Sequence, residues 1–128
     1  MKTLTTILVL LVRIEAPIII TLGLLFWTGN ALFLIPLHML LGIVLVLALW
    51  TLSVVAAVAG VNLGLVAVAA LWGVVVPILG LAQERLLPGP AHWVIQVLHL
   101  LVGLTAIALA QVLANQTRRS PKLLSPAR

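Results

Sequence analysis

The length of its apolar runs is the feature that most constrains this chain. No charged residue occurs in the stretch 16–83, and charge-free runs of eighteen or more residues recur. An α-helix of about that length crosses the hydrocarbon core of a bilayer, which is roughly 30 Å thick. Hydrophobic residues make up 64% of the 128 positions, more than a soluble domain of this size can bury. The sequence therefore predicts an all-α integral membrane protein.

Loop signals divide the apolar sequence into four segments. Glycine, proline and polar residues interrupt it in the stretches WTGN, AGVN, QERLLPGP and NQTRRSPK. The predicted membrane spans are residues 5–28, 31–58, 63–82 and 91–114. Because the connections are short, neighbouring spans must run antiparallel, which predicts an up-down four-helix bundle over residues 1–114. We expect residues 115–128 to form a basic, flexible cytoplasmic tail.

The positions of lysine and arginine near the span ends predict the orientation of the bundle. If both termini lie on one side, that side carries Lys2, Arg118, Arg119, Lys122 and Arg128. The opposite side carries a single basic residue. This asymmetry predicts a multi-pass protein of the cell (inner) membrane with both termini in the cytoplasm. Most of the basic residues that give the net charge of +5 flank the membrane spans, where they are explained by the orientation of the protein. No nucleic-acid partner is therefore expected.

Two short motifs predict that the bundle is a duplicated helical hairpin. The stretch LHMLLG at 37–42 parallels LHLLVG at 98–103, with leucine, histidine, leucine and glycine at matching positions. Pro17 and Pro77 lie inside the first and third spans at a similar offset. A duplication of this kind relates the second span to the fourth. These two spans are diagonal in an up-down bundle, and both histidines lie near their outer ends.

His38 and His99 are therefore predicted to face each other in the outer half of the membrane. An imidazole in hydrocarbon is costly unless it is hydrogen-bonded or coordinated, so an intramembrane histidine indicates function. Two imidazoles from facing helices are the axial ligands that a haem iron takes. Gly42 and Gly103 lie one turn further along the same helix faces, where the missing side chains leave room for a flat macrocycle.

On these four residues the chain resembles the membrane b-type cytochromes, in which four-helix bundles hold haem b between histidines of facing helices. The resemblance implies one haem b per chain, with His38 and His99 as the iron ligands. It departs from the two-haem cytochromes because only one such histidine pair is present. We expect His92, on the same helix face as His99, at the outer mouth of the cleft, where it would contact a propionate, pass protons or sit in the interface. Arg85 in the outer loop is the expected cation for a propionate.

The function favoured by these residues is electron transfer, or haem sensing or handling, with an unidentified redox partner or quinone. Another metal, proton handling or a structural role would also use the paired histidines. The chain lacks cysteine, a serine–histidine–carboxylate set, a zinc-helix motif and a phosphate loop, so a stand-alone enzyme is less expected.

Glu15 supports a different interpretation, a small proton-coupled transporter. A carboxylate in the first of four spans is similar to that of the small multidrug transporters, although the similarity ends at this residue. Arg13 is two positions away, too close along a helix to pair well with Glu15, and is expected to extend to the inner interface. A third interpretation is an accessory subunit of a membrane complex. Because four spans leave a large lateral surface, a homodimer is also plausible.

Overall fold

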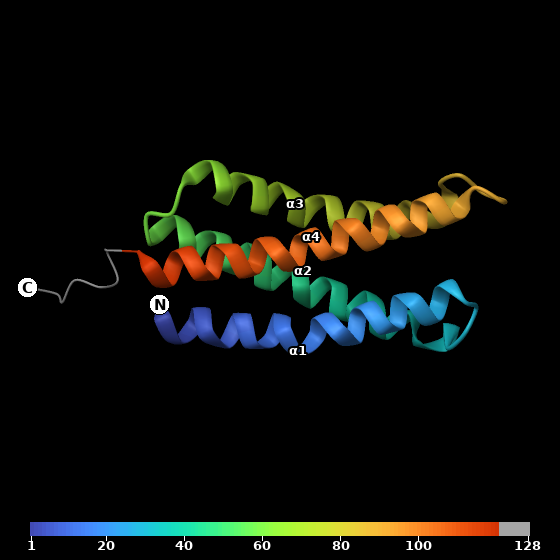
Figure 1. The fold of residues 1–128 in the computed structure, drawn as a ribbon, viewed down its shortest axis with the longest axis horizontal. Helices are drawn as coiled ribbons and strands as arrows, with labels where there is room; N and C mark the ends of the chain where they lie inside the picture. Colours follow the sequence, from blue (N-terminus) through green and yellow to red (C-terminus); the bar gives the residue numbers. More distant parts are fainter. Residues whose placement is uncertain (121–128) are drawn as a thin grey trace, which may run out of the picture.

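The computed structural model describes residues 1–120 and consists of four long helices (Figure 1). They are α1 (Lys2–Trp27), α2 (Ile35–Val58), α3 (Leu63–Ala82) and α4 (His92–Arg119). Single 3-10 turns, η1 (Leu32–Leu34) and η2 (Gln83–Arg85), precede α2 and follow α3. All four helices are long and apolar enough to cross a membrane, which confirms the predicted all-α class.

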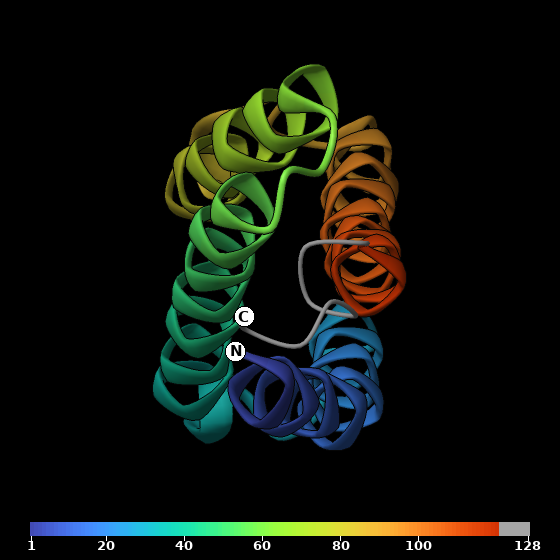
Figure 2. The same ribbon diagram turned by 90° about the vertical axis from the view of Figure 1, so that its left-hand side faces the viewer.

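The four helices alternate in direction, so each connection lies at one end of the bundle or the other (Figure 1). We call the end that holds the N-terminus, the α2–α3 connection and the end of α4 the terminal end. The opposite end, with the α1–α2 and α3–α4 connections, is the loop end. Helices α2 and α4 pack against each other, and each also packs against α1 and α3. Viewed along the bundle, α1 and α3 lie on opposite sides (Figure 2), so α2 and α4 form the diagonal pair that the sequence predicted.

Local sequence explains where α2 and α3 begin and end. Pro36 occupies the first turn of α2, where a missing N–H leaves no hydrogen bond unmade. Gly60 adopts a φ of 82° just after α2 ends, a left-handed conformation that glycine enters at little cost. The side chain of Asn62 then caps α3 by accepting a hydrogen bond from the backbone N–H of Leu65 at 3.2 Å. The α2–α3 connection is therefore short and well defined.

Helix α4 is longer than the sequence predicted. It continues to Arg119, so residues 115–119 of the predicted flexible tail are helical. The polar residues there end the apolar span without ending the helix, because Arg118 and Arg119 interact favourably with the dipole at its C-terminus. The remainder of the predicted tail, residues 121–128, lies outside the described residues.

Packing is tighter in the terminal half of the bundle than in the loop half. Every buried side chain of α2 lies between Leu45 and Ala56, and none lies in its first ten residues, 35–44. Helix α3 likewise has no buried residue after Val76. The largest fully buried apolar side chains, each at most 2% exposed, form the core of the terminal half: Val12, Leu45, Leu49, Leu52 and Leu113. The loop half, where both histidines lie, therefore buries fewer side chains of α2 and α3.

Two indole rings tie neighbouring helices together by hydrogen bonds to backbone carbonyls. Trp50 Nε1 on α2 donates to the carbonyl oxygen of Ala70 on α3 at 3.0 Å. Trp72 Nε1 on α3 donates to the carbonyl oxygen of Val102 on α4 at 2.9 Å. In an apolar medium these N–H groups have few other partners, so both bonds help to fix how α3 sits against the diagonal pair.

Candidate functional site

Helices α2 and α4 bring the two intramembrane histidines together. His38 lies in the first turn of α2, just after η1, and His99 lies about two turns into α4. Their ring centroids lie 6.2 Å apart, with 44° between the ring planes. Both side chains are partly buried. The juxtaposition that the sequence predicted is present.

The nitrogens of this histidine pair are not fully used by the protein. Among residues 1–120, the Nδ1 atoms of His38 and His99 are buried and have no hydrogen-bond partner. An unpartnered buried ring nitrogen costs free energy comparable to a lost hydrogen bond. Each ring therefore has one nitrogen that makes no hydrogen bond to another described residue.

The spacing of the two rings agrees with that of two ligands on one metal ion. A metal bound to an imidazole nitrogen at about 2.0 Å lies roughly 3.2 Å from the centroid of that ring. Two imidazoles on opposite sides of the same ion therefore have centroids about 6.4 Å apart, given the same bond length. The observed separation between His38 and His99 is 6.2 Å. The separation of the ring centroids is therefore compatible with two ligands of one ion.

Two glycines that sequence reasoning did not single out lie against the imidazoles. A Cβ atom on Gly23 of α1 would be 3.5 Å from His38 Cε1, and one on Gly80 of α3 would be 3.3 Å from His99 Cε1. Each hairpin thus places a glycine of its first helix against the histidine of its second. This repeated contact supports the duplicated hairpin. The available signal was a glycine near the loop end of the first helix in both hairpins.

The two predicted glycines have open surroundings. A Cβ atom on Gly42 would meet only Ile19 Cδ1, at 3.9 Å, and one on Gly103 would meet nothing within 4 Å in the described part of the chain. Both glycines lie one turn from a histidine towards the terminal end. The space beside them is compatible with a planar group, and their role stays a prediction.

The remaining residues near the loop end form its edge. The ring of Phe26 meets His38 edge-on, with centroids 5.4 Å apart. His92 Nδ1 lies 3.2 Å from the carbonyl oxygen of Leu86, which ties the start of α4 to the preceding loop. Arg85 is exposed in η2. Both His92 and Arg85 are at the same end as the histidine pair, and their roles towards a propionate stay predictions.

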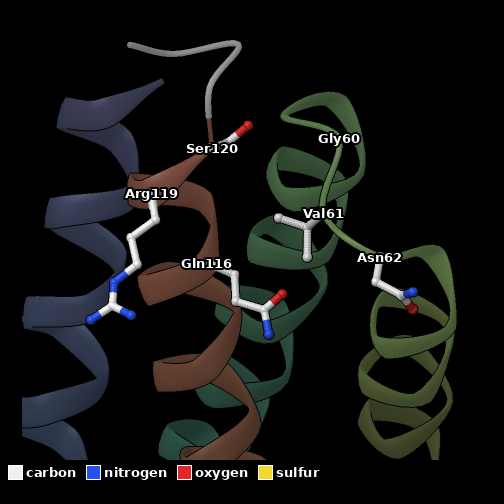
Figure 3. Close-up of a pocket in the computed structure, with 6 residues that line it drawn as sticks. All are labelled: Gly60, Val61, Asn62, Gln116, Arg119 and Ser120. Atoms are coloured by element: carbon white, nitrogen blue, oxygen red, sulfur yellow. The ribbon is translucent and has the colours of Figure 1, made fainter.

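A polar hollow of about 280 Å³ lies at the opposite, terminal end (Figure 3). It is lined by residues of the α2–α3 connection and the end of α4: Gly60, Val61, Asn62, Gln116, Arg119 and Ser120. Ser120 Oγ donates a hydrogen bond to the carbonyl oxygen of Ala59 beside it. In Figure 3 the guanidinium of Arg119 points away from the other lining residues, towards α1. This hollow is separate from the histidine site.

Glu15 and Arg13 have different environments although they are neighbours on α1. Glu15 is 3% exposed, and neither carboxyl oxygen has a hydrogen-bond partner within residues 1–120. Arg13 is exposed, and its Nε donates to Oε1 of Gln111 on α4 at 3.1 Å. The two side chains do not pair, as their spacing predicted.

Comparison with protein-family models, curated proteins and solved structures found no match to this chain. Among residues 1–120, no three histidine or carboxylate side chains gather in a group suited to a metal ion. The candidate site therefore consists of the His38 and His99 imidazoles and the residues that contact them.

Proposed function

We propose that this protein is a membrane haem b protein in which His38 and His99 are the two axial ligands of one haem iron. The observation that carries the proposal is the facing imidazole pair, with centroids 6.2 Å apart and an unpartnered buried nitrogen on each ring among the described residues. The proposed activity is one-electron transfer within the bilayer. Haem sensing or haem handling would use the same site if one of the two histidine ligands could dissociate from the iron.

The residues around the pair fit a haem in three respects. Two neutral imidazoles are a ligand set that haem iron takes. Residues 35–44 of α2, which include His38, have no buried side chain, so the site is accessible from the side of the bundle. Gly42 and Gly103 offer backbone without side chains one turn from each ligand, where a flat ring could approach.

The chain's own residues would hold and tune the site. When bound, haem supplies a one-electron iron couple. His38 and His99 would hold the iron, and a pair of imidazole ligands favours electron transfer over oxygen or peroxide chemistry. Gly23 and Gly80 let the two rings lie close to α1 and α3, so the helices of each hairpin set the orientation of its ligand.

The membrane and the orientation are part of the same proposal. Lys2, Arg118 and Arg119 lie at the terminal end, and Arg85 lies at the loop end beside Glu84. Under the positive-inside rule, this distribution favours a cytoplasmic terminal end, and the proposed haem would then lie in the outer half of a cell membrane. A redox protein or a quinone would then exchange electrons with the haem, and a homodimer is compatible with the lateral surface.

Absorption spectra of the purified protein, oxidised and dithionite-reduced, test the proposal. Protein from haem-replete cells should show a Soret band and sharp reduced α and β bands typical of a low-spin, six-coordinate iron. His38→Ala and His99→Ala should each abolish that spectrum. The matched control is His92→Ala, which should keep the low-spin spectrum, because His92 contacts the loop at Leu86 and is not a proposed ligand of the iron. A colourless wild type, or equal spectra in all three variants, would refute the proposal.

A further inference from the structure

Arg13 is a charged residue on the outer surface of α1, far from both ends of the helix. It follows Lys2, the first residue of α1, by eleven positions, or roughly 17 Å at 1.5 Å per residue. Because α1 has 26 residues, Arg13 lies close to its middle. Its side chain is exposed, and so are the neighbouring apolar side chains of Leu10 and Ile14. Arg13 therefore presents a positive charge on a surface that otherwise faces hydrocarbon.

The side chain of Gln111 holds the guanidinium of Arg13 at this depth. Helices α1 and α4 pack against each other and run in opposite directions (Figure 2). At the terminal end, Arg118 Nη2 donates to Thr6 Oγ1 at 3.5 Å. Seven residues further along each helix, Arg13 Nε donates to Gln111 Oε1 at 3.1 Å. The guanidinium is thus held two turns, or roughly 10 Å, inside the contact at the terminal end, although the sequence predicted that it extends to the interface.

The contact with Gln111 leaves the charge of Arg13 uncompensated. The amide of Gln111 is neutral and accepts one hydrogen bond, from Nε, whereas the Nη1 and Nη2 groups make none to another residue of the chain 1–120. Glu15 is 3% exposed and lies on a different face of α1. An arginine inside a membrane is costly unless it is paired. Its free N–H groups form a fork that matches the two oxygens of a carboxylate.

A second copy of this chain does not supply that carboxylate. The chain has two acidic residues, Glu15 and Glu84. The side chain of Glu15 is buried, so it is not available to a neighbouring molecule. Glu84 lies in η2 at the loop end, so in either direction of insertion it would be near a membrane surface and not at the depth of Arg13. The carboxylate must therefore come from a different molecule.

A transmembrane helix fits this position better than a lipid headgroup does. Lipid phosphates lie at the membrane surface, outside the hydrocarbon core, and the guanidinium is held two turns inside the contact between Thr6 and Arg118. A transmembrane helix, in contrast, can carry a carboxylate at any depth. Ala108, one turn from Gln111 on α4, is exposed and small, which lets the backbone of a neighbouring helix approach.

We infer that the outer face of α1 and α4 at Arg13 and Gln111 is the docking site for a transmembrane helix of another protein, whose aspartate or glutamate pairs with Arg13 near the middle of the membrane. The guanidinium fork binds the carboxylate, and Gln111 positions the guanidinium. This surface lies on the lateral face of the bundle, away from the two imidazoles, and its role does not depend on haem.

A synthetic transmembrane peptide tests this inference in vesicles of phosphatidylcholine. The peptide consists of leucine and alanine with one glutamate at its midpoint, which matches the depth of Arg13 in either direction of insertion. Control peptides have leucine at the midpoint, or the glutamate near one end. Energy transfer between the labelled full-length protein and the labelled peptide measures association. The wild type should bind the central-glutamate peptide roughly tenfold more tightly than either control, as expected for one polar contact between membrane helices.

Substitution of Arg13 identifies the residue responsible. Arg13→Gln should remove the preference for central glutamate, whereas Arg119→Gln, a matched loss of a basic residue at the terminal end of α4, should leave it unchanged. Circular dichroism checks that each variant folds, and Arg13→Leu takes the place of Arg13→Gln if the latter does not. Equal binding of the three peptides by the wild type would overturn the inference. So would a preference that is equal in the Arg13 variant and in Arg119→Gln.

A lipid at this surface would give a different result. Spin-labelled phosphatidylglycerol added to the same vesicles should be immobilised equally by the wild type and by Arg13→Gln. Stronger immobilisation by the wild type, without a preference for the central-glutamate peptide, would identify an anionic lipid as the occupant and overturn the inference. The haem spectrum of Arg13→Gln should equal that of the wild type, so this test and the test of the histidine pair can fail independently.

Discussion

Gly73→Ala is the substitution for which the structure gives the sharpest expectation. Gly73 lies on α3 directly beneath the indole of Trp50, which reaches across from α2 to bond the carbonyl of Ala70. A Cβ atom on Gly73 would lie 2.9 Å from Trp50 Cδ1 and closer still to Nε1. Neither helix backbone can yield easily, so the indole must move and its hydrogen bond must lengthen or break.

The expected loss of stability follows from three contributions. Overpacking of a rigid contact costs about 1–3 kcal/mol. Loss of the Trp50 hydrogen bond costs about 1 kcal/mol. The higher helix propensity of alanine offsets up to about 1 kcal/mol of this loss. The offset is smaller if the denatured protein remains helical in the membrane. Gly73→Ala should therefore lower the free energy of unfolding by about 2 kcal/mol.

A double-mutant cycle separates this clash from other effects. In a Trp50→Ala background the obstruction is gone, so adding Gly73→Ala should be neutral or slightly stabilising. The coupling between the two positions should be about 2 kcal/mol, within the range for residues in contact. Unfolding in mixed micelles with increasing denaturing detergent, followed by circular dichroism, measures all four proteins. Equal effects of Gly73→Ala in both backgrounds would refute the proposed contact.

Four further substitutions test the site and the helix contacts around it. Gly80→Ala should displace the His99 ring by a few tenths of an ångström and reduce the low-spin fraction of the haem spectrum. Gly23→Ala should reduce that fraction less, because its Cβ would lie 3.5 Å from His38 Cε1, whereas the Cβ at Gly80 would lie 3.3 Å from His99 Cε1. Trp72→Phe should lower the free energy of unfolding by about 1 kcal/mol in the same detergent assay, because the hydrogen bond to the Val102 carbonyl on α4 is lost. An unchanged free energy of unfolding would show that this hydrogen bond does not contribute to stability. Glu15→Leu should raise the free energy of unfolding by about 1–3 kcal/mol, because it removes a buried carboxyl that has no hydrogen-bond partner among residues 1–120. A decrease would contradict this and would indicate that the carboxyl has a partner in the membrane.

Much of the architecture follows from the sequence because its signals are local. Apolar runs of membrane-crossing length define four helices, and short connections force them to alternate in direction. The predicted spans therefore agree with the helices to within a few residues, except that α4 continues to Arg119. The recurrence of histidine in the two hairpins, at 38 and 99, was enough to predict that these side chains meet across the diagonal.

Other features of the site depend on how each helix is rotated about its axis. In a soluble bundle, a polar outer face reveals which side of a helix points inward. Here the lipid-facing side is as apolar as the core, so the sequence carries little of that information. Packing of all four helices at once decides that Gly23 and Gly80 contact the imidazoles. The same packing leaves the carboxyl of Glu15 buried without a hydrogen-bond partner among residues 1–120.

Contacts between distant residues complete the site for the same reason. Arg13 meets Gln111 across 98 positions of sequence, a contact that no local pattern encodes. The sequence by itself thus determined the class of protein, its four spans and the histidine pair. The tertiary structure alone decided which faces of the helices meet, and with them the surroundings of the imidazoles and of the buried Glu15 carboxyl.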